Sequence, residues 1–172
     1  IEWYIFADCF RIFIISRHSP QPIIWTSSSQ DLENLGSWFL KYVEEYDAYR
    51  KAQNQVESNE RQSQWETSIG DHLQQLADIL HINHILSHIP KTCDQLILIP
   101  HLYLHLFPLH ALPISSSNSC DSTSYLLDRF AKGIRYTPSC QLLQSLQQQQ
   151  SSEFQRLFAI QNPTADLYEK YE

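Results

Sequence analysis

Histidine is the most concentrated of the residues in this chain that could carry chemistry. Seven of the eight histidines fall between residues 72 and 110. His81, His84 and His88 stand at helical spacing, so one face of a helix would carry all of them. Neutral imidazole is a common metal ligand, and such a face could support a metal site. No cysteine pair or acidic residue completes a recognisable ligand pattern, so we expect no metal centre and no cofactor.

Cysteine is the second candidate for chemistry. The four cysteines are Cys9, Cys93, Cys120 and Cys140; they are widely spaced and form no Cys-x-x-Cys, which favours free thiols in a reducing cytoplasm. A catalytic cysteine needs a thiolate, a nearby histidine and an oxyanion hole. Cys140 fits best, because it falls in the first turn of a predicted helix, where the dipole would lower its thiol pKa. The alternative is an ordinary structural cysteine, and this is our prediction.

The elements that must position these side chains are organised around the stretch from Asp94 to Pro113. Leu96–Ile99 is a short apolar run closed by Pro100, which predicts a buried strand of a mainly parallel sheet. Leucines then alternate with aromatic residues and histidines, and Pro108 excludes a regular helix. We expect an irregular, buried connection whose apolar side chains pack on the sheet and whose histidines find polar partners.

A hairpin region is predicted over residues 1–26. Glu2–Phe6 and Arg11–Ser16 are apolar runs typical of paired antiparallel strands, and Ile23–Thr26 supplies a third strand. A capping box at Ser28–Asp31 then opens a helical region over residues 29–90.

Two amphipathic helices are predicted in this helical region, separated by a polar surface loop at Gln53–Ser63. The first carries its apolar face at Leu32, Leu35, Phe39, Tyr42, Val43, Tyr46 and Tyr49; the second carries it at Trp65, Ile69, Leu73, Leu76, Ala77 and Leu80. Pro90 ends the helical region.

Residues 94–163 are predicted to start a parallel α/β core. After a polar, exposed loop at Ser115–Ser124 comes a short strand at Ile134–Thr137. Pro138 is a good first helical residue, and Leu157–Ile160 is the last strand. Strands that alternate with helices predict right-handed crossovers and a parallel sheet. The predicted fold class is therefore α/β, with a mainly parallel sheet and an N-terminal antiparallel hairpin, in one domain over residues 1–172.

Four blocks of the sequence carry a family resemblance. They are Leu-Ile-Leu-Ile-Pro-His with Leu-His-Leu-Phe-Pro-Leu-His-Ala-Leu-Pro, then Tyr125–Arg129, Ile134–Ser139 and Leu157–Pro163. In this order they closely resemble the CHAT domain, a caspase-like domain often found behind TPR repeats in bacteria, especially cyanobacteria. The resemblance implies a caspase-like three-layer sandwich. Leu102 departs from the family, which usually has a small or basic residue there, so we expect a different turn after His101.

The resemblance also implies a cysteine peptidase related to caspases and separases. The family keeps its catalytic histidine in a His-Gly motif and its cysteine in an Ala-Cys motif, and this chain contains neither dipeptide. It also starts at Ile1 and has no methionine. We therefore expect an incomplete domain, the N-terminal portion of a CHAT protein, with no catalytic residue and no activity alone. The alternative is a non-catalytic scaffold or protein-interaction domain.

One wall of a substrate cleft is predicted at the ends of the strands. Ligands of open parallel sheets bind outside the carboxyl ends of the strands. The residues expected there are His101, Pro138, Ser139, Asn162 and Pro163. The alternative is that these prolines only terminate strands.

Composition narrows the choice of partners. The chain has 172 residues, 42% of them hydrophobic, which suits one globular domain. Its net charge of −7 argues against a nucleic-acid partner, and it has no apolar run of the ~20 residues that span a bilayer. The opening residues lack the pattern of a signal peptide. We expect a cytoplasmic protein whose partners are a protein or peptide substrate and a TPR region of the same polypeptide.

Overall fold

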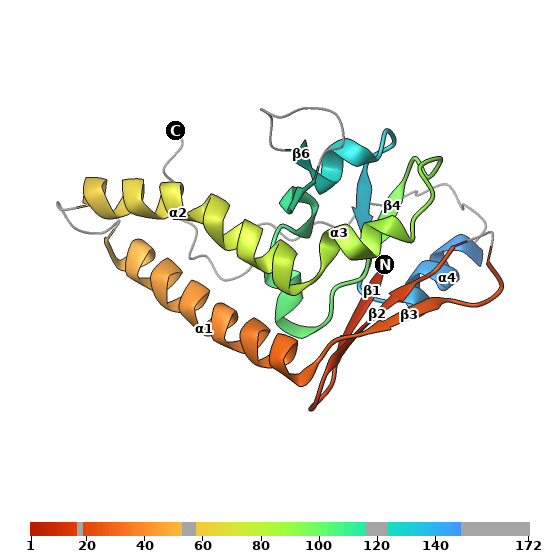
Figure 1. Cartoon of the computed structure of the whole chain (residues 1–172). Coiled ribbons are helices and arrows are strands. Elements are labelled where there is room, and N and C mark those ends of the chain that lie inside the picture. The colour runs from red at the N-terminus through yellow and green to blue at the C-terminus, as the bar shows by residue number, and fades with distance from the viewer. Residues whose placement is uncertain (17–18, 53–57, 116–123, 149–172) are drawn as a thin grey trace, which may run out of the picture.

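A helical layer packs on a mixed sheet in this protein (Figure 1). The computed structural model describes residues 1–16, 19–52, 58–115 and 124–148. Three strands and then three helices precede the parallel strands, and both parallel and antiparallel strand pairs occur, so the structure mixes helices and sheets in a way that is consistent with the predicted α/β class. No helix in these ranges is long and apolar enough to cross a membrane.

Three N-terminal strands form an antiparallel sheet, as the apolar runs predict. They are β1 (Glu2–Ile5), β2 (Phe10–Ile14) and β3 (Ile23–Thr26), with Ile12 in register between Trp3 and Trp25. Phe10, Ile12 and Ile14 are buried, whereas Arg11 between them is exposed. Alternation with a period of two therefore sets which face of β2 meets the core.

The other edge of β1 lies beside the parallel strands. β4 (Leu96–Leu98) pairs in parallel with β7 (Ile134–Tyr136), as predicted. A parallel bridge joins Glu2 to Ile99, where Trp3 N–H donates to the Ile99 carbonyl at 3.0 Å. The strands therefore follow the order β3-β2-β1-β4-β7, which was not predicted. The predicted strand at Leu157–Ile160 lies outside the described residues.

Two long helices, α1 (Ser29–Ala52) and α2 (Ser58–Ile79), run side by side (Figure 1). The short α3 (Ile82–Ser87) follows. The prediction of a loop through Ser63 is wrong, because α2 already begins at Ser58. The residues in question, Ser-Asn-Glu-Arg-Gln-Ser, contain no glycine or proline, and glutamate, arginine and glutamine are good helix formers. The polar composition of this segment was therefore not sufficient evidence for a loop.

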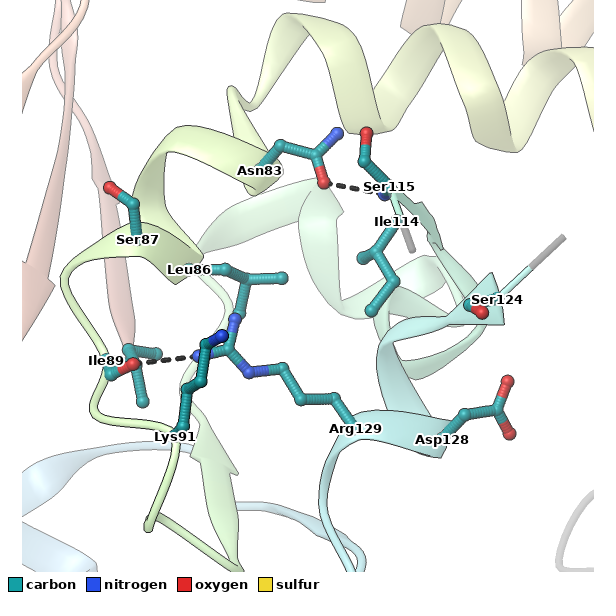
Figure 2. Close-up of a pocket in the computed structure, with 10 residues that line it drawn as sticks. All are labelled: Asn83, Leu86, Ser87, Ile89, Lys91, Ile114, Ser115, Ser124, Asp128 and Arg129. Atoms are coloured by element: carbon teal, nitrogen blue, oxygen red, sulfur yellow. Dashed lines mark hydrogen bonds between the residues drawn. The ribbon is translucent and has the colours of Figure 1, made fainter. Parts of the chain in front are cut away.

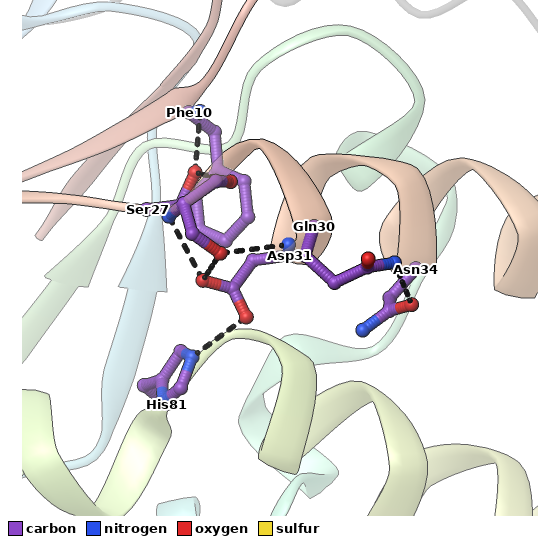
Figure 3. A network of polar contacts seen from close by, with 7 residues as sticks. Phe10, Ser27, Gln30, Asp31, Asn34 and His81 are labelled. Carbon is purple, nitrogen blue, oxygen red and sulfur yellow. Dashed lines mark hydrogen bonds and ion pairs between the residues drawn. The ribbon is translucent and has the colours of Figure 1, made fainter.

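The start of α1 is tied to both the sheet and α3 (Figure 3). Ser28 and Asp31 form the predicted capping box, since the Asp31 carboxylate accepts from the Ser28 N–H and the Ser28 hydroxyl accepts from the Asp31 N–H. The second carboxylate oxygen of Asp31 lies 3.2 Å from His81 Nε2. Ser27 holds β2 by accepting from the Phe10 N–H at 2.9 Å. This network sets the angle at which α1 leaves the sheet.

One core joins the sheet to these helices. Its fully buried residues from the sheet are Trp3, Phe10, Ile12 and Leu98, and those from the helices and the turn between α2 and α3 are Leu35, Leu76, Leu80, Ile82 and Ile85. Trp38 Nε1–H donates to the carbonyl of His72 at 3.1 Å and so fastens α1 to α2. The predicted apolar face of α1 is correct at Leu35 but not along its whole length, since Val43 and Tyr46 are each 42% exposed.

The connection after β4 consists of two short 3₁₀ helices, η1 (Leu102–Leu106) and η2 (Leu109–Ala111). Leu104 and Leu109 are fully buried as predicted, but Leu102 and Leu106 are 59% and 70% exposed. Leucines two residues apart cannot all face the core in a turn of about three residues. The expectation that this segment packs all its apolar side chains on the sheet is therefore wrong.

The described chain closes with short elements. β5 (Pro113–Ile114) pairs antiparallel with β6 (Ser124–Tyr125), and a 3₁₀ turn, η3 (Leu126–Arg129), leads to β7. Most of the predicted polar loop, residues 116–123, lies outside the described residues. The last helix is α4 (Cys140–Gln148).

Candidate functional site

The strands β1, β4 and β7 run in the same direction and end at one edge of the sheet. The chain leaves β4 through Pro100 and His101, and it leaves β7 through Thr137, Pro138 and Ser139. Of the predicted cleft residues, His101, Pro138 and Ser139 therefore do lie at the ends of neighbouring strands. Asn162 and Pro163 lie outside the described residues. Within the described part of the chain, no hydrogen bond joins His101 to Pro138 or Ser139.

His101 is held from the side of β1. Its Nδ1 accepts a hydrogen bond from the Ile5 N–H at 3.1 Å, and its ring stacks on Tyr4 with centroids 4.2 Å apart. A backbone N–H can only donate, so Nδ1 carries no proton and the proton of the neutral ring sits on Nε2. His101 is half-buried, and its Nε2–H can donate to a ligand at this edge.

The turn after His101 contains left-handed backbone, and whether it differs from the turn of the family stays a prediction. Leu102 adopts φ 52°, in the left-handed region that side chains with a Cβ disfavour. The side chain of Leu102 is 59% exposed, so packing offers it little compensation. The backbone strain at this position lies directly beside the candidate site.

The residues that follow β7 form the N-terminal cap of α4. The Ser139 hydroxyl accepts from the Leu142 N–H at 3.1 Å, which makes Ser139 the cap of the helix. Thr137 is buried, and its N–H donates to the Leu98 carbonyl at 3.0 Å. The prediction that Pro138 is the first helical residue is wrong, because Ser139 supplies the cap and α4 begins one residue later.

Two tyrosines that sequence reasoning missed also lie near these strand ends. Tyr4 stacks on His101, and the Tyr136 hydroxyl accepts from the His110 N–H at 2.9 Å and lies 3.0 Å from His110 Nδ1. Burial raises the pKa of Tyr136, and the His110 N–H partly offsets this rise. The phenol is therefore neutral near pH 7 and can donate to His110 Nδ1. No motif points to this pair, since its residues are 26 positions apart.

The surroundings of Cys140 disfavour its thiolate. Its thiol donates to Glu2 Oε2 at 3.3 Å. Burial raises the thiol pKa, and the hydrogen bond and negative charge of Glu2 raise it further. The expectation that a position in the first turn of α4 would lower this pKa is therefore wrong: the adjacent carboxylate and burial outweigh the partial charge of the helix end.

The other candidate residues are dispersed. Cys93 donates to the Gln95 carbonyl at 3.2 Å, and Cys9 is buried. His81 pairs with Asp31, and His84 Nε2 lies 3.4 Å from His88 Nε2. The described ranges contain no group of three histidine, cysteine, aspartate or glutamate side chains that could hold a metal ion.

Comparison with known proteins points to one family. The family model described as the CHAT domain matches residues 70–170, more than half of the chain. The matched range contains β4, β7, the 3₁₀ connection and all of α4. No curated protein and no solved structure matches the chain.

Proposed function

The chain belongs to the CHAT domain family, and from this premise we propose that it is the N-terminal part of a caspase-like cysteine peptidase domain, inactive on its own. The observation that carries the proposal is the CHAT match over residues 70–170, the range that holds the parallel pair β4–β7. Under this proposal the protein is cytoplasmic and works on a protein or peptide, next to a TPR region of the same polypeptide.

The proposed architecture is a three-layer sandwich. Helices α1, α2 and α3 share one core with the sheet face that carries Trp3 and Ile12. Glu2 is the neighbour of Trp3 on β1, so its side chain lies on the opposite face. The hydrogen bond from Cys140 to Glu2 brings the start of α4 to that face and so supports a second helical layer there.

The proposed substrate wall comprises His101, Pro138 and Ser139, together with Asn162 and Pro163. His101 offers a hydrogen-bond donor at Nε2. Pro138 is exposed, and it follows β7, the strand that pairs with β4. The site supports binding rather than bond cleavage. Cys140 stays protonated against Glu2, and Ser139 is used as a helix cap, so neither serves as a nucleophile.

The last predicted strand, Leu157–Ile160, would leave one edge of the parallel sheet unpaired unless a further strand follows it. In the described ranges β7 pairs only with β4, and its other side is where we propose that this last strand lies. An unpaired strand edge favours association with other strands. We therefore expect residues 1–172 to be marginally stable or self-associating, and a longer product of the same gene to be monomeric.

A comparison of two proteins tests this proposal. One is residues 1–172, and the other is extended along the gene through a His-Gly and an Ala-Cys motif. We expect thiol-dependent cleavage of unfolded protein substrates by the extended protein alone, with activity lost when the cysteine of its Ala-Cys motif is replaced by alanine. Hydrolysis by residues 1–172 that disappears in Cys140→Ala would overturn the proposal. A gene that encodes neither motif would favour the non-catalytic scaffold instead.

A further inference from the structure

A pocket of about 550 Å³ lies beside α3 and the β5–β6 pair, on residues distinct from those at the carboxyl ends of the strands (Figure 2). This volume is within the usual range of pockets that hold small molecules. Part of its lining is apolar and comes from Leu86, Ile89 and Ile114. The pocket therefore offers a surface on which a compact apolar group can pack.

Two cationic side chains, Lys91 and Arg129, enter this pocket from separate segments (Figure 2). Arg129 Nη2 donates to the Ile89 carbonyl at 2.8 Å, which holds the guanidinium in place and leaves its other N–H groups for a ligand. Within the described ranges neither cation forms an ion pair, whereas Lys41, Lys51 and Lys132 do. Two positive charges thus share one pocket in a chain of net charge −7.

The one acidic residue that lines the pocket does not neutralise them. Asp128 accepts a hydrogen bond from the Tyr125 N–H at 2.8 Å, within the turn that starts η3. Figure 2 shows its carboxylate turned away from the guanidinium of Arg129. The head groups of Lys91 and Arg129 are therefore available to an external anion.

We propose that this pocket binds a small organic anion. Its oxyanion, a phosphate or a carboxylate, is held by Lys91 and Arg129, and its apolar part packs on Leu86, Ile89 and Ile114. A guanidinium fork suits the oxygen spacing of both head groups, and an ammonium adds a second charge-assisted hydrogen bond. This site is independent of the peptide wall at the strand ends.

Titration of the 172-residue protein with three probes tests the site, with binding followed by amide NMR shifts or calorimetry. Phenyl phosphate and benzoate share a ring and differ in head group, so the tighter binder identifies the oxyanion. Inorganic phosphate lacks the apolar part and is expected to bind about tenfold more weakly than phenyl phosphate, because it buries no ring. Added salt is expected to weaken all three.

Matched variants assign the binding to this pocket. Lys91 is exposed, so Lys91→Gln should fold normally and weaken binding of the tighter probe by about tenfold, as expected for one lost charge-assisted hydrogen bond. Lys51→Gln removes the same charge from the end of α1 and should leave the affinity unchanged. The proposal is overturned if phenyl phosphate and benzoate show no saturable binding at millimolar concentrations, or if the two variants bind equally well.

Discussion

The thiol of Cys140, at the start of α4, donates a hydrogen bond to the carboxylate of Glu2 on β1, 138 residues earlier in the chain. This contact ties the last described helix to the strand that joins the two parts of the sheet. It also determines the chemistry of the cysteine, because a neighbouring carboxylate disfavours the thiolate.

The first prediction concerns this pair. Burial and Glu2 hold the thiol pKa of Cys140 above its ordinary value near 9. Replacing Glu2 by glutamine removes the negative charge and should speed alkylation of Cys140 at pH 8 by roughly threefold or more. The rate is measured by mass spectrometry of the peptide that contains Cys140. Glu33→Gln, on the exposed side of α1, serves as the control, and equal rates in the two variants would contradict the prediction.

The second prediction concerns the backbone strain at Leu102. Because glycine adopts φ 52° without a Cβ clash and the leucine side chain is 59% exposed, Leu102→Gly should raise the free energy of unfolding by about 1 kcal/mol. Leu106→Gly is the matched control in the same 3₁₀ helix. Leu106 does not have a left-handed backbone conformation, so Leu106→Gly should lower the free energy of unfolding. Urea denaturation measures both, and destabilisation of similar size in the two variants would refute the strain.

The third prediction concerns β4, a strand with a neighbour on each side. Leu98 is fully buried, so Leu98→Ala should lower the free energy of unfolding by about 3 kcal/mol. Leu98→Asp should prevent folding, because it buries an unpaired charge. Leu40→Ala, at a position that is 68% exposed on α1, should change stability by only about 0.5 kcal/mol or less. Circular dichroism would reveal a folded Leu98→Asp protein, which would contradict the assignment of this strand to the core.

The fourth prediction concerns acid sensitivity at the start of α1. Burial acts to raise the pKa of Asp31, but hydrogen bonds from Ser28 and His81 outweigh it and leave the pKa below its usual value of 3.8. A carboxyl group whose pKa is lower in the folded state stabilises the fold above its unfolded pKa, and this contribution disappears as the pH falls through the folded value.

Asp31→Asn should therefore destabilise the protein at pH 7 and should destabilise it less at pH 3, below the usual pKa of the carboxyl group. Denaturation curves at the two pH values measure this. Glu44→Gln, an exposed position on α1, should show no such pH dependence. If Asp31→Asn loses the same stability at both pH values, the loss comes from the capping geometry and the charge of Asp31 does not contribute.

The local sequence pattern was sufficient to predict most of the strands and the helix cap near the site. The alternation in Phe10–Ile14, the capping box of Ser28 and Asp31, and the apolar run that ends at Pro100 each express a preference that acts over a few residues. These preferences are strong because burial of one face, or satisfaction of one helix end, depends on neighbours in sequence. They also predicted that His101 and Ser139 follow neighbouring parallel strands.

Tertiary structure decided what lies next to those elements. An apolar strand does not encode its partner, so nothing in Glu2–Ile5 indicated that β1 would lie between β2 and β4. That placement brings Ile5 to His101 and Glu2 to Cys140, and it reverses the pKa shift expected for the thiol from its position in α4. The sequence by itself determined where β1, β2, β3, β4, β7 and the cap of α1 occur, and which side chains are candidates for the site. Only the packed structure decided their charges and hydrogen bonds, because these depend on residues that are distant in the chain and adjacent in space.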